Sequence, residues 1–179
     1  LENIYNIVDF KNKKIELKSD IKVNKIKNCN FINNNFSVEC NYYGGLIDNC
    51  SFTGHNSETL INKGMLIISN QEISVLNSKI GTQFSYGIAI LIKSEGALND
   101  ITYNVIFDNL FIGGGNYGIY FSSKLAITQC LFSNIRFNYI KNAGISCSDD
   151  CPLCAHHVFN NIVMQPGKNA IGIDLTKIV

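Results

Sequence analysis

Residues 134–137 read NIRF, and residues 144–147, which begin ten residues after the asparagine, read GISC. Polar or small residues alternate with apolar ones in both tetrads. Such alternation is typical of β-strands because successive side chains of a strand face opposite sides. The segment therefore predicts two short strands in succession, one opened by Asn134 and one opened by Gly144.

Both signals recur along the chain. Asparagine-led tetrads begin at Asn28, Asn49, Asn77, Asn109, Asn134 and Asn161. Glycine-led strands begin at Gly87, Gly118, Gly144 and Gly172, and a third apolar stretch precedes most of the asparagines. The uneven intervals of 21 to 32 residues between asparagines fit coils whose loops vary in length. The repeat predicts three strands per coil.

The alternation also predicts which side chains face solvent. In the asparagine-led strands these are Asn30, Ser51, Lys79, Phe111, Arg136 and Val163. In the glycine-led strands they are Ala89, Tyr120, Ser146 and Asp174. Stacked coils would place equivalent residues about 4.8 Å apart, so that like residues form ladders. An asparagine suits such a corner because it tolerates left-handed backbone, and its amide can both donate and accept hydrogen bonds along the stack.

The asparagine corner, the glycine-led strand and residues 8–17 (VDFKNKKIEL) resemble right-handed parallel β-helices of the pectate-lyase-like superfamily. Within it, the chain is most similar to bacteriophage tail spikes. The resemblance implies an all-β, single-stranded right-handed parallel β-helix, a solenoid of about six coils with an asparagine ladder. Residues 1–27 would form an N-terminal strand and capping segment leading into the first coil, and residues 28–179 the β-helix, as a piece of a longer chain.

Other architectures fit the sequence less well. An antiparallel sandwich or barrel would need tight hairpin turns, yet the chain has no Asn-Gly or Asp-Gly dipeptide. Helical repeats are disfavoured because β-branched residues dominate and apolar residues do not recur at intervals of three and four.

The tail-spike resemblance implies that a homotrimer on a virion tail or another extracellular surface recognises a bacterial surface polysaccharide. Whether the protein also depolymerises the glycan, as a glycoside hydrolase or a lyase, stays open. The alternative is a non-enzymatic β-helical adhesin or a structural solenoid that mediates protein contacts. A calcium-dependent lyase is less favoured because no outward column stacks several Asp residues.

Composition excludes several function classes. Fifteen basic and fourteen acidic side chains give a net charge of +1, which argues against a dedicated nucleic-acid partner. No apolar run approaches the roughly 18 residues of a membrane-spanning helix, so membrane insertion is not expected. Residues 113–118 (GGGNYG) match a dinucleotide-binding pattern, but a strand rather than a helix follows, so no cofactor is expected.

Carboxylates are the candidate catalytic groups for glycan cleavage. Asp48 and Asp108 each precede a ladder asparagine with one coil between them, which predicts a separation of about 9.6 Å, near the range that inverting glycosidases use. Turn capping is the competing role. Asp149, Asp150 and Asp174 are weaker candidates. Tyr120 and Arg136 suit stacking and hydrogen bonding to sugars, although outward apolar residues such as Phe111 equally suit a trimer interface.

Cysteines are the last group that could carry chemistry. The repeat places Cys29, Cys50 and Cys147 in the core, and it aligns His157 with Cys130 on a strand. Cys151 and Cys154 form a C-x-x-C half-site that His156 or His157 could complete for zinc. An ordinary loop is favoured over a metal site or a disulfide, so no metal is expected.

Overall fold

The structure is a computed structural model, and its described part is all-β. It describes residues 3–6, 9–11, 15–18, 24–32, 38–41, 45–55, 64–69, 73–82, 88–94, 102–103, 105–123, 127–148, 157–167 and 169–174. These residues contain no helix, and every strand pairing among them is parallel. The antiparallel sandwich and barrel alternatives are therefore wrong for this part of the chain.

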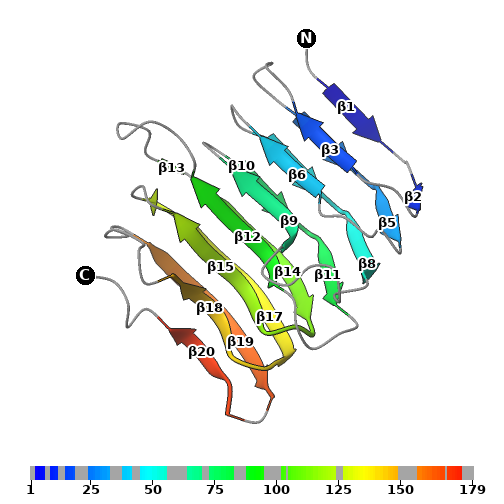
Figure 1. The fold of residues 1–179 in the computed structure, drawn as a ribbon. Helices are drawn as coiled ribbons and strands as arrows, with labels where there is room; N and C mark the ends of the chain where they lie inside the picture. Colours follow the sequence, from blue (N-terminus) through cyan, green and yellow to red (C-terminus); the bar gives the residue numbers. More distant parts are fainter. Residues whose placement is uncertain are drawn as a thin grey trace.

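The strands form three rows (Figure 1). The first row contains β1 (Asn3–Asn6), β4 (Asn24–Lys27), β7 (Gly45–Asp48) and β10 (Ile73–Leu76). The second contains β2 (Asp9–Lys11), β5 (Asn30–Ile32), β8 (Ser51–His55) and β11 (Lys79–Thr82). The third contains β3 (Ile15–Lys18), β6 (Val38–Asn41), β9 (Gly64–Ser69), β12 (Ile88–Ser94), β15 (Tyr117–Ser123), β18 (Ala143–Cys147) and β20 (Ile171–Asp174).

Three longer strands join the first two rows into one sheet. These are β14 (Ile106–Gly113), β17 (Leu131–Ile140) and β19 (Val158–Pro166). Strand β14 pairs with β10 through residues 106–108 and with β11 through residues 111–113, so one strand serves both rows. A separate short pair links β13 (Thr102–Tyr103) and β16 (Ile127–Thr128).

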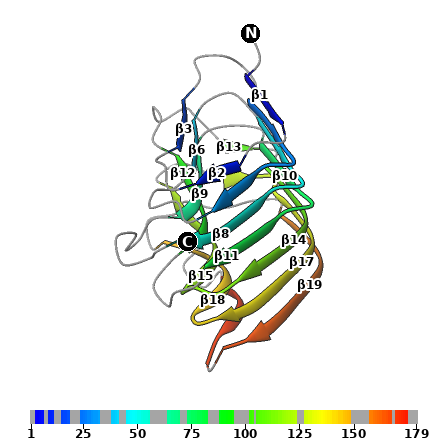
Figure 2. The same ribbon diagram turned by 90° about the vertical axis from the view of Figure 1, so that its right-hand side faces the viewer.

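Each row stacks in chain order. The first row runs from β1 through β4, β7, β10 and β14 to β17 and β19, and the third runs from β3 to β20 (Figures 1 and 2). The strands within residues 1–27 already belong to these rows, because β1 pairs with β4, β2 with β5 and β3 with β6. Successive strands of each row therefore pair in chain order, and β14, β17 and β19 are shared by the first two rows.

The backbone turns at the asparagines. Asn28, Asn49, Asn77, Asn109, Asn134 and Asn161 all have left-handed φ angles between 49° and 54°. Glycine, which has no Cβ, adopts this conformation most readily, and Asn is among the L-residues that tolerate it because its short polar side chain can hydrogen-bond locally. The repeated residue therefore coincides with a repeated bend between the first and second rows.

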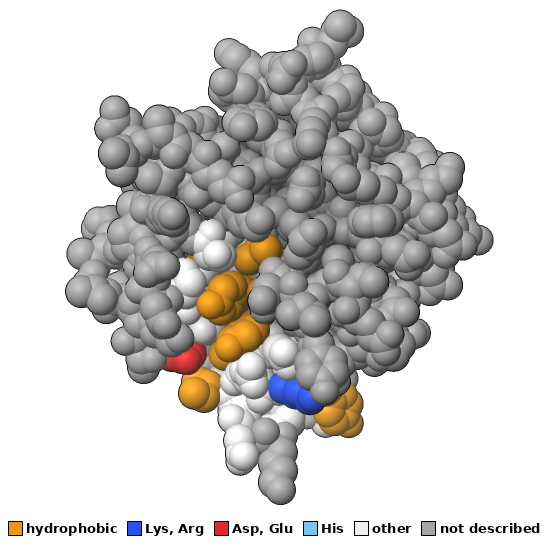
Figure 3. Space-filling model, in the orientation of Figure 1, with side chains coloured by type: hydrophobic (Ala, Val, Ile, Leu, Met, Phe, Trp, Pro, Cys, Tyr) orange, Lys and Arg blue, Asp and Glu red, His pale blue; other side chains and the backbone are white. Residues whose placement is uncertain are grey.

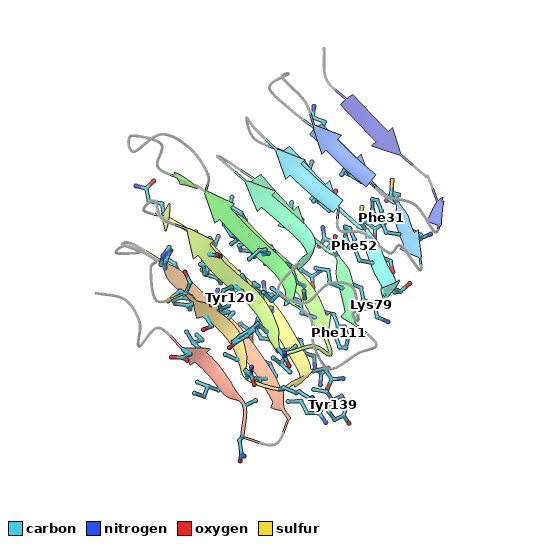
Figure 4. All side chains as sticks on the ribbon, in the orientation of Figure 1. Phe31, Phe52, Lys79, Phe111, Tyr120 and Tyr139 are labelled. Carbon is cyan, nitrogen blue, oxygen red and sulfur yellow. The ribbon has the colours of Figure 1, made fainter. Side chains whose placement is uncertain are left out.

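Stacked aromatic and aliphatic side chains fill the interior between the rows. The rings of Phe107 and Phe132 stack with centroids 5.3 Å apart, and those of Phe132 and Phe159 with centroids 4.9 Å apart. Phe31 and Phe52 stack at 4.5 Å in earlier layers (Figure 4). Each fully buried ring contributes roughly 1.5–3 kcal/mol. The predicted core positions of Cys29, Cys50 and Cys147 are confirmed, because all three are buried.

The predicted outward column of the third row is partly wrong. Ile90 pairs with Ile119, so Ala89, rather than Gly87, is level with Gly118. Ala89 is buried in the core cluster, because this column of small residues faces the interior beside Phe137. Ser146 is level with Tyr120, but it too is buried, with an exposed fraction of only 3%. Gly87 lies outside the described residues. The alignment failed because two small residues, two positions apart, both fitted the local pattern.

Candidate functional site: a groove along the asparagine corner

A groove of about 670 Å³ follows the bend between the first and second rows, and we call it the ladder groove. Its lining is Asn28, Asn30, Asn49, Cys50, Ser51, Asn77, Ser78, Lys79, Asn109, Leu110, Phe111, Asn134 and Arg136. A second hollow of about 500 Å³ is lined by Asn109, Asn134, Ile135, Arg136, Asn161 and Val163. The two hollows share Asn109, Asn134 and Arg136. We call the six asparagines at the bend the ladder asparagines, and the strands at the level of each one a layer. The depression therefore continues from the layer of Asn28 to that of Asn161.

Side-chain amides are hydrogen-bonded from layer to layer along this groove. Asn49 donates its Nδ2–H to Oδ1 of Asn28 at 2.7 Å, and Asn109 donates to Asn77 at 2.8 Å. Asn161 donates to Asn134 at 2.8 Å. The asparagines therefore form a fixed row of polar groups at the exposed surface.

Two of the steps use a carboxylate instead. Asn77 donates to Oδ1 of Asp48 at 2.9 Å, and Asn134 donates to Oδ1 of Asp108 at 2.9 Å. The second carboxylate oxygen of Asp48 lies 3.8 Å from Nζ of Lys27. Asp48 and Asp108 each pair with Leu76, so they are two strand steps apart, as the sequence predicted. Neither carboxylate lines the groove.

The outward residues of the second row form the other part of the groove. They are aligned by strand register in the order Asn30, Ser51, Lys79, Phe111, Arg136, Val163, and we call them the outer column. Asn30, Lys79, Arg136 and Val163 are exposed, while Ser51 and Phe111 are half-buried. The prediction that these side chains face solvent is confirmed.

A cation, an aromatic ring and a second cation lie in consecutive layers of this column. Lys79 Nζ lies 5.6 Å from the centroid of the Phe111 ring (Figure 4). Arg136 pairs in register with Phe111 on the other side. In the part of the chain that the structure describes, neither Lys79 nor Arg136 has an ion-pair partner. Sequence reasoning identified Arg136 as a sugar-binding candidate but missed Lys79, although both occupy the same repeat position.

Tyr120, the other predicted sugar-binding residue, lies elsewhere. It projects from β15 in the third row and contacts Tyr117, with ring centroids 4.8 Å apart. Both tyrosines pack against the buried Ile88 and Leu91. Figure 3 shows apolar side chains gathered over this part of the third row. The structure therefore does not bring Tyr120 and Arg136 together.

The remaining candidates do not form a described cluster. Asp174 is half-buried on β20, where it pairs in register with Ser146. Asp149, Asp150, Cys151, Cys154 and His156 lie outside the described residues. Within the described ranges no group of three His, Cys, Asp or Glu side chains could hold a metal ion.

His157 lies on the interior side of its layer. Its Nδ1 accepts a hydrogen bond from the backbone N–H of Cys130 at 3.2 Å, and its ring lies 6.1 Å from that of Phe132. The predicted alignment with Cys130 is confirmed, because Val158 N–H donates to the carbonyl of Cys130. Its buried Nε2 has no hydrogen-bond partner among the described residues.

Comparison with known proteins gives no family for this chain. No protein-family model matches it, and a search of curated proteins returns no significant match. In the described part of the chain, no helix has the length and apolar character needed to cross a membrane.

Proposed function

We propose that the chain is a right-handed, single-stranded parallel β-helix whose ladder groove binds a linear bacterial surface polysaccharide. The observation that carries this proposal is the continuity of the groove. Ladder asparagines line it in successive layers from Asn28 to Asn161, at strand spacings of about 4.8 Å. A polymer with a short repeating unit can make similar contacts with each layer of such a surface.

The chemistry of the lining suits sugars. Amide groups of the ladder offer hydrogen-bond donors and acceptors to hydroxyl groups. The half-buried ring of Phe111 offers an apolar surface between them. Ligand sites commonly combine such an apolar surface with a small number of fixed polar groups. The hydrogen bonds between ladder amides fix the orientation of these amide groups before a glycan binds.

The groove favours binding over cleavage. Glycoside hydrolysis by the common mechanism needs two carboxyl groups that flank the scissile bond. Among the described residues that line the groove, none is Asp or Glu. Asp48 and Asp108 accept hydrogen bonds from ladder amides outside the lining. The tail-spike origin, the homotrimer and the virion or extracellular location follow from the sequence resemblance alone and stay predictions.

The test is binding of the full chain to panels of capsular polysaccharides and lipopolysaccharides, followed by reducing-end and unsaturated-sugar assays. We expect at least one polysaccharide to bind without release of products. Phe111→Leu should weaken this binding because it removes the ring but keeps an apolar side chain. Tyr120→Leu is the matched control on the third row and should leave binding unchanged.

Other outcomes would redirect the assignment. Loss of binding in Tyr120→Leu but not in Phe111→Leu would move the site to the third row. Reducing ends or unsaturated sugars would establish a hydrolase or a lyase, respectively. Absence of binding across the panels would contradict the proposal and favour the alternative of a structural solenoid that mediates protein contacts.

A further inference from the structure

We infer that the ladder groove is specific for acidic polysaccharides that carry a carboxylate or sulfate on every second sugar, bound by Lys79 and Arg136. This inference rests on the proposed function and adds the class of glycan. The two cations belong to the outer column and point from alternate layers of the same sheet. They are exposed, whereas Phe111 between them is half-buried.

The spacing of the cations sets the repeat of the ligand. Lys79 pairs with Phe111, and Phe111 pairs with Arg136, so the two cations are two strand steps apart. Two steps place the backbones of Lys79 and Arg136 about 9.6 Å apart along the stack, and their flexible side chains carry the charges within reach of that spacing. This distance is close to the length of a disaccharide in an extended glycan. An acidic group on every second sugar could therefore meet each cation in turn.

The positive charge of the groove is local. The chain as a whole carries a net charge of only +1, yet the described lining contains two cations and no carboxylate. Asp48 and Asp108 lie outside the lining, where they accept hydrogen bonds from Asn77 and Asn134, and Asp48 is also 3.8 Å from Nζ of Lys27. Neither Lys79 nor Arg136 has an ion-pair partner in the described part of the chain, so both can bind an external anion.

The three side chains divide the recognition between them. The planar guanidinium of Arg136 can bind a carboxylate through two parallel hydrogen bonds, while the Lys79 ammonium acts as a point charge. The Phe111 ring lies 5.6 Å from Lys79 Nζ, where it can contact the sugar between the two acidic groups. A polynucleotide fits less well, because single-strand binding uses several aromatic rings for successive bases and this column has one.

The experiment uses hyaluronan, which carries a carboxylate on every second sugar, and the same polymer after reduction of its carboxyl groups. We expect hyaluronan to bind the full chain about tenfold more tightly than the reduced polymer, as two partly exposed ion pairs would give. Added salt should weaken hyaluronan binding but not binding of the reduced polymer. A single-stranded oligodeoxynucleotide should compete poorly.

Variants separate the charge from the groove itself. Lys79→Gln and Arg136→Gln should each weaken hyaluronan binding by about threefold and leave binding of the reduced polymer unchanged. Lys141→Gln, which removes an exposed lysine outside the groove, is the control for net charge. All three positions are exposed, so the variants should fold, which circular dichroism and thermal melting would verify.

The outcomes also distinguish this inference from the proposed function. Absence of hyaluronan binding, or equal binding of both polymers, overturns the acidic specificity. The groove proposal survives if Phe111→Leu still weakens binding to a polysaccharide of the panel. Equal effects of Lys141→Gln, or effective competition by the oligonucleotide, would show nonspecific attraction of polyanions and overturn the inference. If no polysaccharide binds the chain, both the groove proposal and the acidic specificity are wrong.

Discussion

Asn134 donates its side-chain amide to Oδ1 of Asp108 at 2.9 Å, and Asp108 precedes the ladder asparagine of the adjacent layer. Asn77 makes the equivalent bond to Asp48. The ladder is therefore a mixed series in which a carboxylate replaces an amide oxygen at two steps. This arrangement gives Asp48 and Asp108 a structural role that the two-carboxylate hypothesis did not include.

Replacing Asp108 tests this structural role. Asp108→Ala removes the acceptor of the Asn134 amide and should lower the free energy of unfolding by about 1 kcal/mol, as loss of one hydrogen bond does. Asp108→Asn keeps an oxygen at the same position and should cost less. Urea unfolding monitored by circular dichroism gives both values. Equal losses in the two variants would show that the charge, rather than the hydrogen bond, stabilises the corner.

The left-handed corner can be tested at Asn109, whose φ is 53°. Asn109→Gly removes the hydrogen bond to Asn77 but adopts this conformation without strain. Asn109→Ala removes the same hydrogen bond and also places a Cβ in the left-handed region, which costs roughly 1–2 kcal/mol. We therefore expect the alanine variant to unfold at lower urea concentration than the glycine variant. The reverse order would contradict the conformational explanation for the repeated asparagine.

Local alternation predicts much of this fold. Ile135 and Phe137 are buried and Arg136 is exposed, as the tetrad around them indicates, because the direction of a strand side chain depends on its position alone. The burial of Ala89 could not be predicted in the same way. Which residues Ala89 lies beside depends on the register between β12 and β15. The next residues in its column, Gly118 and Gly144, must be small because the Phe137 ring, which comes from another row, packs against them.

The site was partly predictable for the same reason. The outward position of Arg136 follows from the tetrad, and the separation of Asp48 and Asp108 by one layer follows from the repeat. The bond between Asp108 and Asn134 depends on side-chain geometry between layers, which a single sequence does not reveal. The absence of an ion-pair partner for Lys79 among the described residues likewise depends on which side chains the neighbouring strands place beside it.

Glycines of the third row provide a steric test. A Cβ at Gly144 would lie 2.7 Å from the carbonyl oxygen of Gly172 and 2.9 Å from the Phe137 ring. Gly144→Ala should therefore lower the free energy of unfolding by about 1–3 kcal/mol, as overpacking does. At Gly172 the nearest atom would be Sδ of Met164, at 3.9 Å. Gly172→Ala is the matched control and should be tolerated; a similar loss in both variants would contradict the packing of Phe137 against this column.

Tyr139 is a strained position, because its φ is 54° although it is neither glycine nor asparagine. Its side chain is 63% exposed, so its removal costs little packing. Tyr139→Asn should raise the free energy of unfolding by about 1 kcal/mol, since asparagine tolerates this conformation. Tyr139→Ala removes the same ring but keeps the backbone strain, so thermal unfolding should show no increase in its stability over wild type. Equal gains would attribute the effect to loss of the exposed ring.

The buried thiol of Cys50 should make the free energy of unfolding depend on pH. Burial raises the pKa of its thiol from 9.0 to about 11. The neutral thiol is therefore favoured in the native state, while the unfolded chain ionises first. Its contribution to stability is complete below about pH 9 and is lost as the pH rises through about 11.

Cys50→Ser isolates this contribution. Serine occupies the same position in the next layer, where Ser78 Oγ donates to the carbonyl of Leu76 at 2.7 Å, just as Cys50 Sγ contacts the carbonyl of Asp48 at 3.3 Å. The variant should therefore fold. Urea titration at pH 8, 9, 10 and 11 measures the unfolding free energies of wild type and Cys50→Ser. Relative to the variant, the wild type should lose stability only above about pH 9. A difference that is constant across this range would contradict the burial of the thiol.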